Sequence, residues 1–288
     1  MRAPRFAALG DSLTAGVGDP VSGGRPRGWA ALLAGGLAAG PEPAEFLNLA
    51  VSGAVSADVV RGQLAAALAF DPDLASVVVG VNDTLRCSFD IHAYARRLDT
   101  VLAELTGRGT VVLTACLPDP GALIGLPAPL ARPLARRQRA VNAVVHELSR
   151  RYDAVHLHAA SPPPGPEFRS GDRLHPSERG HRRLAAGFHV LLSARGLAPG
   201  PRPRLEPDRP APARAASLWL LATTGTGWVL RRCGDLLPQL LLLAAAEIRH
   251  ERRGGGTALE LSAARAVVAA LGQLPLRGTN RSGVPEAA

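Results

Sequence analysis

Five short apolar runs, each followed by a helical pattern, constrain the fold of this chain more than any other feature. The runs are nearly continuous in apolar residues and are bounded by turn residues, which is typical of strands buried on both faces of a parallel sheet. They cover Phe6–Leu9, Glu45–Leu49, Ala75–Val79, Thr110–Ala115 and Ala154–Leu157. Because strand and helix alternate about five times, the sequence predicts an α/β fold with a doubly wound parallel sheet and helices on both faces.

The segments after these runs carry apolar residues at helical spacing. The expected helices cover Gly28–Ala38, Ser56–Ala69, Ile91–Gly109, Ala135–Tyr152 and Ser177–Gly196. Two longer connections, Leu117–Pro133 and His158–Pro176, are rich in proline and are expected to be functional or mobile loops. Ligands bind at the carboxyl ends of the strands in such sheets, so the loops that follow the strands are expected to carry the chemistry.

The alternating pattern ends near Leu197, so residues 1–197 are predicted to form one domain. Residues 198–214 are rich in proline and arginine without periodicity, which predicts a linker. Residues 215–275 are strongly apolar and predict a helical C-terminal extension, followed by a disordered tail over 276–288. Within the extension, helices are expected over Ala215–Arg232, Leu236–Arg253 and Ala258–Leu274.

Charge and cysteine usage narrow the expected partners and compartment. All 33 basic residues are arginine and the net charge is +9, yet no aromatic–basic motif accompanies them, so no nucleic-acid partner is expected. Cys87, Cys116 and Cys233 are widely spaced, which indicates free thiols in a reducing compartment and no metal site. No signal-type apolar region precedes Phe6, so a cytoplasmic location is expected. The Leu-rich, Arg-flanked extension leaves open a weak membrane-surface contact, packing on the main domain or self-association.

Ser12 lies at the carboxyl end of the first expected strand, in the motif Gly-Asp-Ser. A serine hydroxyl is a weak nucleophile near neutral pH and needs a general base. His175 follows the last strand, and Asp172 precedes it by three residues. In a turn, this spacing lets the carboxylate reach Nδ1 and leaves Nε2 free to face a hydroxyl, and Ser-Asp-His is a known chain order for triads. The alternatives are a turn serine and an Asp–His pair that merely caps a helix.

Acyl transfer also needs hydrogen-bond donors aimed at the developing oxyanion. Gly53 follows the second strand, and its amide can approach a ligand because there is no side chain in the way. Asn82 follows the third strand, where its amide can point into the same crevice. The alternatives are a helix-entry turn at Gly53 and an ordinary turn at Asn82–Asp83. Four strands that each end in a residue type needed by one reaction favour a hydrolase site.

Four blocks of this sequence resemble those of the SGNH hydrolase superfamily, also called the GDSL esterase/lipase family. The blocks, in order, are ALGDSLTAG with Ser12, NLAVSGA with Gly53, GVNDTL with Asn82, and DRLHPSERGH with Asp172 and His175. The resemblance spans residues 5 to about 190 and implies a three-layer αβα sandwich of flavodoxin-like type with a five-stranded parallel sheet. It also implies an oxyanion hole formed by the Ser12 and Gly53 amides and the Asn82 side chain.

The expected activity is that of a serine esterase that hydrolyses small-molecule carboxylic esters through an acyl-enzyme, with catalytic residues Ser12, Asp172 and His175 and no cofactor or metal. The apolar segment Leu117–Pro133 and the few aromatic residues favour short acyl or lysophospholipid-like substrates. The alternatives are an O-acetylesterase or deacetylase acting on carbohydrates or small metabolites, and an inactive SGNH-fold binding protein.

Three further residues near these blocks are candidates for support or substrate contact. Asp11 is expected to organise the loop around the nucleophile rather than to transfer protons. Asp83 is expected to support the Asn82 turn. Arg86 either binds an anionic substrate group or faces solvent.

Overall fold

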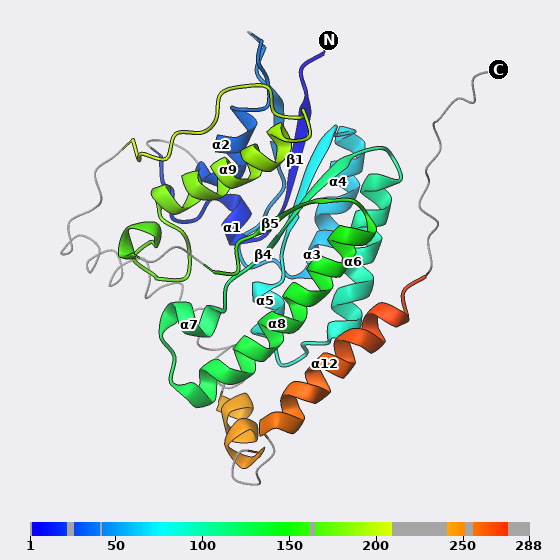
Figure 1. Ribbon diagram of the computed structural model, residues 1–288, viewed down its shortest axis with the longest axis vertical. Coiled ribbons are helices and arrows are strands. Elements are labelled where there is room, and N and C mark those ends of the chain that lie inside the picture. The colour runs from blue at the N-terminus through cyan, green and yellow to red at the C-terminus, as the bar shows by residue number, and fades with distance from the viewer. Residues whose placement is uncertain are drawn as a thin grey trace.

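A five-stranded, entirely parallel sheet with the strand order β2-β1-β3-β4-β5 forms the centre of the molecule (Figure 1). It is seen in a computed structural model that describes residues 2–21, 26–40, 42–161, 165–208, 241–250 and 256–275. The strands are β1 Arg5–Gly10, β2 Glu45–Asn48, β3 Leu74–Val78, β4 Val111–Cys116 and β5 Val155–His158. All five predicted strands are present, each within one residue of its expected bounds, and the predicted α/β class is confirmed.

Helices cover both faces of this sheet. On one face, α2 (Gly28–Ala34) and α9 (Glu178–Ser193) pack against the strands, and the rings of Trp29 and Phe188 stack with their centroids 4.9 Å apart. On the other face lie α4 (Leu64–Phe70), α6 (Ile91–Thr106) and α8 (Ala128–Arg151) (Figure 1). The apolar residues of alternate strand positions thus contribute to two separate cores, as a sheet buried on both faces requires.

The segment after β2 forms three helical pieces in place of the single helix expected over Ser56–Ala69. These are α3 (Ser56–Asp58), the π-helical turn η1 (Val59–Gln63) and α4. The buried Gln63 side chain accepts a hydrogen bond from Gly10 N at 2.8 Å and donates one to Gly10 O at 2.9 Å. The helical segment therefore holds both backbone groups of the last residue of β1.

The expectation of a loop over Leu117–Pro133 is wrong for most of its length, because helix α7 (Pro120–Ile124) and the start of α8 occupy it. Asp119 caps α7 by accepting a hydrogen bond from Gly121 N at 2.8 Å, and Pro120 occupies the first turn, where a missing N–H costs nothing. Pro133 lies inside α8, where its absent N–H removes one hydrogen bond of a 24-residue helix. Pro120 is thus placed where a helix tolerates proline, whereas Pro133 is accommodated inside α8 with the loss of that hydrogen bond.

Residues 198–208, expected as the first part of a linker, pack against the domain. Ser193 Oγ donates a hydrogen bond of 2.9 Å to Ala198 O, and His189 Nε2 lies 3.0 Å from Gly200 O. Asp208 pairs with two arginines of the domain, Arg27 at 2.6 Å and Arg182 at 2.5 Å. The predicted domain boundary at Leu197 is therefore too early, because residues 198–208 pack on the same domain.

Helix α12 (Gly256–Gly272) coincides with the helix expected over Ala258–Leu274 and lies along α6 and α8 (Figure 1). Residues 241–250 are helical and form the described part of the helix expected over Leu236–Arg253. The helix expected over Ala215–Arg232, the rest of the linker and the tail 276–288 lie outside the described residues. Within the described ranges, no helix has the length and apolar character needed to cross a membrane.

Candidate active site

Ser12 is delivered by the sharp transition from β1 into the short helix α1 (Ser12–Ala15). Gly10 has φ of +151°, and a Cβ at this position would lie 2.2 Å from Val78 O on the neighbouring strand, so only glycine fits. Asp11 caps α1 by accepting a hydrogen bond from Leu13 N at 3.1 Å. The strand end, the glycine and the cap together fix Ser12 at the carboxyl edge of the sheet.

Asp172 and His175 come from the segment between β5 and α9, and they meet Ser12 at this edge. His175 Nδ1 lies 2.6 Å from Asp172 Oδ2, and His175 Nε2 lies 2.7 Å from Ser12 Oγ. The spacing of three residues works because Asp172 Oδ1 also accepts hydrogen bonds from the backbone N–H groups of Leu174 at 3.0 Å and His175 at 2.9 Å. A continuous chain of hydrogen bonds therefore runs from carboxylate to imidazole to hydroxyl.

Hydrogen bonds and charge around Asp172 keep its carboxylate ionised. Burial alone would raise the pKa of Asp172, but the hydrogen bond and charge of His175, with a further hydrogen bond of 2.6 Å from Ser170 Oγ, outweigh it and lower the pKa to about 2. An ionised carboxylate orients the imidazole and stabilises the imidazolium that forms when the ring takes a proton.

Gly53 and Asn82 lie beside Ser12 in the same pocket. Gly53 has φ of +85°, and no acceptor among the described residues takes a hydrogen bond from its backbone N–H or from that of Ser12. Asn82, at the start of α5 (Val81–Thr84), donates from Nδ2 to Ala54 O at 3.1 Å and to Asp11 Oδ2 at 3.2 Å. The pocket that Ser12 lines is therefore also lined by two further residues that carry N–H donors, Gly53 and Asn82.

Two buried carboxylates support the donors. Asp83 accepts hydrogen bonds from Ser56 N at 3.0 Å and from Ser56 Oγ at 2.5 Å, tying the loop after β2 to the Asn82 turn, and burial raises its pKa. Asp11 is 3% exposed, and burial raises its pKa to about 6 although hydrogen bonds from Leu13 and Asn82 act in the opposite direction. Asp11 thus accepts a backbone hydrogen bond beside Ser12, and Asp83 links the loop after β2 to the turn of Asn82.

The pocket in front of Ser12 has a volume of about 370 Å³ and two kinds of lining. One is apolar and includes Leu117, Leu123, Leu157, Leu184 and Leu205. The other is cationic and consists of Arg169, Arg183 and Arg202. Arg86, expected as a possible substrate contact, does not belong to this lining. Because the three arginines come from separate parts of the chain, no local sequence motif identified them as pocket residues.

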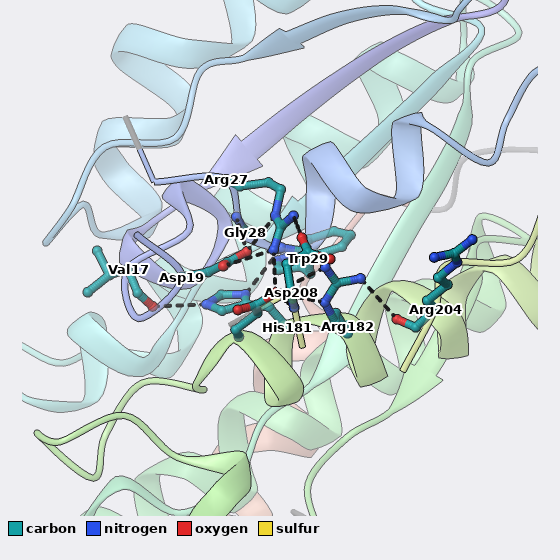
Figure 2. A network of polar contacts seen from close by, with 10 residues as sticks. Val17, Asp19, Arg27, Gly28, Trp29, His181, Arg182, Arg204 and Asp208 are labelled. Atoms are coloured by element: carbon teal, nitrogen blue, oxygen red, sulfur yellow. Dashed lines mark hydrogen bonds and ion pairs between the residues drawn. The ribbon is translucent and has the colours of Figure 1, made fainter. Parts of the chain in front are cut away.

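A network of ion pairs and hydrogen bonds joins the loop after α1, the start of α2, helix α9 and residues 204–208 (Figure 2). Arg27 bonds Asp19 at 3.0 Å, Glu178 at 2.8 Å and Asp208 at 2.6 Å. The fully buried His181 accepts a hydrogen bond from Trp29 N at 3.2 Å through Nδ1, while Nε2 lies 2.9 Å from Val17 O. The loop after α1, the start of α9 and residues near 208 are thereby held together.

Solved structures of other proteins share this fold. The structure is similar to an acetylxylan esterase, Axe2, from Geobacillus stearothermophilus, with a TM-score of 0.54 and 21% identity over 66% of this chain and 94% of that one. It is also similar to TesA, with a TM-score of 0.52 and 22% identity over 66% of this chain and 98% of that one. No curated protein matches the sequence.

An αβα sandwich with a serine at the end of its first strand and a histidine before its last sheet-covering helix defines the class of serine hydrolases with a flavodoxin-like sheet. The sequence model of the GDSL-like Lipase/Acylhydrolase family matches residues 8–183. The chain belongs to this family, as its four sequence blocks predicted.

Proposed function

We propose that this protein hydrolyses carboxylic esters through a Ser12 acyl-enzyme, with His175 as general base and Asp172 as the residue that orients it. The observation that carries the proposal is the continuous hydrogen-bonded chain Asp172–His175–Ser12, with contacts of 2.6 and 2.7 Å. Solved structures of Axe2 include variants described as catalytic mutants, in which a serine, an aspartate or a histidine is replaced by alanine. The aspartate and histidine of those variants are three positions apart, as are Asp172 and His175.

In the proposed reaction, Ser12 Oγ attacks the ester carbonyl while its proton passes to His175 Nε2. The proton is then given to the leaving alcohol, and a water activated by His175 hydrolyses the acyl-enzyme. Asp172, whose pKa is lowered to about 2, is ionised at neutral pH and stabilises the imidazolium in both halves of the reaction.

The oxyanion is proposed to bind the backbone N–H groups of Ser12 and Gly53 together with Asn82 Nδ2. The first two donors have no competing acceptor among the described residues. Asn82 has to redirect one N–H, and its longer hydrogen bond, the 3.2 Å contact with Asp11, is the one that gives way. Each such donor contributes about 3 kcal/mol to stabilisation of the transition state.

The lining of the pocket favours an ester with an acyl chain and an anionic alcohol, which is the chemistry of a lysophospholipid. Leucines from α7, α9, β5 and residues 198–208 give the acyl chain an apolar wall, and a volume of about 370 Å³ suits a small ligand. Arg183 and Arg202 are exposed at the pocket and offer charge-assisted hydrogen bonds to a phosphate.

The test is hydrolysis of p-nitrophenyl esters of increasing acyl length, of a lysophospholipid and of acetylated xylan by the full chain and by Ser12→Ala. We expect Ser12→Ala to lose about 10³-fold or more of kcat. Ser161→Ala is the matched control, because Ser161 lines the same pocket but is exposed and outside the hydrogen-bonded chain. Retained activity in Ser12→Ala contradicts the proposed nucleophile, and turnover of acetylated xylan alone favours an O-acetylesterase.

A further inference from the structure

A thiol and several imidazole groups lie close together at β5, the edge strand of the sheet. They are separate from the hydrogen-bonded residues Ser12, His175 and Asp172. β4 and β5 pair so that Thr114 lies opposite His156 and Cys116 opposite His158. Leu113 and Ala115 face the core under α2 and α9. Because side chains alternate along a strand, Thr114 and Cys116 face the α8 side together with their partners on β5.

The spacing of these groups is close to that of a tetrahedral metal site. Cys116 Sγ lies 3.1 Å from His156 Nε2, and ligand atoms of Cys116, His156 and His158 all lie within 4.8 Å of one another. Zinc–sulfur bonds of about 2.3 Å and zinc–nitrogen bonds of about 2.0–2.1 Å place tetrahedral ligands about 3.3–3.6 Å apart. Small side-chain rotations bring the ligand atoms to these separations. His158 is exposed, so its ring can rotate without displacing core residues.

A third imidazole supplies a fourth ligand. His146 projects from α8, and its ring centroid lies 5.4 Å from that of His156 and 5.5 Å from that of His158. His146 is exposed, so it can turn toward the other three groups. One thiol and three imidazoles are a ligand set that suits zinc and not the hard cations Mg²⁺ and Ca²⁺, which take oxygen ligands.

The surroundings of His156 orient it for coordination. Its Nδ1 lies 2.9 Å from Thr114 Oγ1, and Thr114 Oγ1 lies 2.6 Å from Ser149 Oγ. With Nδ1 held by a hydroxyl, the lone pair of Nε2 faces Cys116 Sγ. Metal-binding histidines characteristically use the second ring nitrogen in this way.

We propose that Cys116, His156 and His158, with His146 as the fourth ligand, form a binding site for one zinc ion. Binding forms a zinc–sulfur bond and breaks the S–H bond of Cys116, whose proton passes to solvent. His158 also lines the substrate pocket, so the ion lies behind one wall of that pocket and takes no part in the attack on the ester.

The experiment uses the full chain without a polyhistidine tag, titrated with Co²⁺ and followed by absorption spectroscopy, and titrated with Zn²⁺ by calorimetry. We expect one equivalent of either ion, with the thiolate-to-cobalt charge-transfer band and the intense visible bands of tetrahedral Co²⁺. Cys116→Ser is expected to abolish the charge-transfer band, and both Cys116→Ser and His158→Gln to weaken Zn²⁺ binding by about 10-fold or more.

Matched controls are Cys87→Ser and His250→Gln, which replace an exposed thiol and an exposed imidazole elsewhere in the chain and are expected to leave stoichiometry and affinity unchanged. If the buried Cys116 proves necessary for folding, the exposed His158 still carries the test. Absence of the charge-transfer band in the unmodified chain, or unchanged Zn²⁺ affinity in His158→Gln, overturns the proposal. Ester hydrolysis by the metal-free chain is measured separately, so failure of one proposal is distinguishable from failure of the other.

Discussion

The side-chain amide of Asn82 donates a hydrogen bond of 3.2 Å to Asp11 Oδ2, which links the loop after β3 to the residue before Ser12. Asp11 in turn caps α1 through Leu13 N. The proposed oxyanion donor and the proposed nucleophile are therefore positioned by one buried carboxylate. Burial raises the pKa of Asp11, so Asp11 is expected to make the stability of the folded protein depend on pH.

Replacing Asp11 by asparagine is expected to change how stability depends on pH. The pKa of Asp11 is about 6 in the folded protein and about 3.8 in an unfolded chain, so the folded state binds the proton more tightly. The contribution of Asp11 to stability is therefore greatest below pH 3.8 and is lost as the pH rises through 6. Relative to the parent protein, Asp11→Asn gains on the order of 3 kcal/mol between pH 4 and 7. Urea unfolding at several pH values measures this difference. The control is Asp58→Asn, which replaces an exposed carboxylate. The prediction is contradicted if the change in unfolding free energy caused by Asp11→Asn varies with pH no more than the change caused by the control.

Asp172→Asn is expected to lower kcat by about 10³- to 10⁴-fold, because the amide no longer holds His175 in the tautomer that accepts the Ser12 proton. Steady-state kinetics with a p-nitrophenyl ester measures the loss. Ser170→Ala is a graded control, since Ser170 Oγ donates to Asp172 Oδ1 but does not contact the imidazole. We expect this variant to lose less than about 10-fold. Comparable losses in the two variants argue against a specific role for the carboxylate charge.

Arg183→Ala and Arg202→Ala are expected to raise KM for a lysophospholipid by about 3- to 10-fold at low ionic strength, with little change for a neutral p-nitrophenyl ester. The effect is expected to shrink as salt is added, because both arginines are exposed. Arg179→Ala, on the same helix as Arg183 but outside the pocket lining, is the matched control. Equal KM changes for the charged and the neutral substrate contradict recognition of an anionic group.

Glu247→Gln is expected to destabilise the docking of the C-terminal helices by about 1–3 kcal/mol. Both oxygens of Glu247, which is 4% exposed, accept hydrogen bonds from Arg136, at 2.8 and 3.0 Å. The control is Glu147→Gln, which breaks a solvent-exposed pair with Arg150 and is expected to cost less than about 1 kcal/mol. Denaturant unfolding, combined with limited proteolysis of the C-terminal region, compares the two. A loss no larger than that of the control means that the pair does not hold the extension in place.

The strands and the three blocks around Ser12, Asn82 and His175 could be predicted because their signals are local. A buried strand is a run of consecutive apolar residues, and Asp172 and His175 are close enough in sequence for their spacing to predict their contact. The helices α7 and α8 were missed at Leu117–Pro133 because proline-rich sequence is also typical of loops. Only the placement of Pro120 and Pro129 in first turns makes the segment compatible with helix.

Contacts that depend on tertiary packing could not be predicted from local sequence patterns. Arg27 meets Glu178 across 151 positions because α2 and α9 pack together. Cys116 meets His156 across 40 positions because β4 and β5 pair, in a register that no local pattern encodes. Widely spaced cysteines therefore suggested no metal site, although the sheet brings one of them beside two imidazoles. The same holds for Arg169, Arg183 and Arg202, which become neighbours only around the finished pocket.

The separation of Ser12 from His175 by 163 positions has a consequence for the order of events during synthesis. Ser12 leaves the ribosome first, directly after β1, a strand that lies between β2 and β3 and cannot be enclosed until both have emerged. His175 follows only with the start of α9. A growing or prematurely terminated chain thus carries the proposed nucleophile without its proposed base, and the proposed ester cleavage requires that nearly the whole domain has been translated.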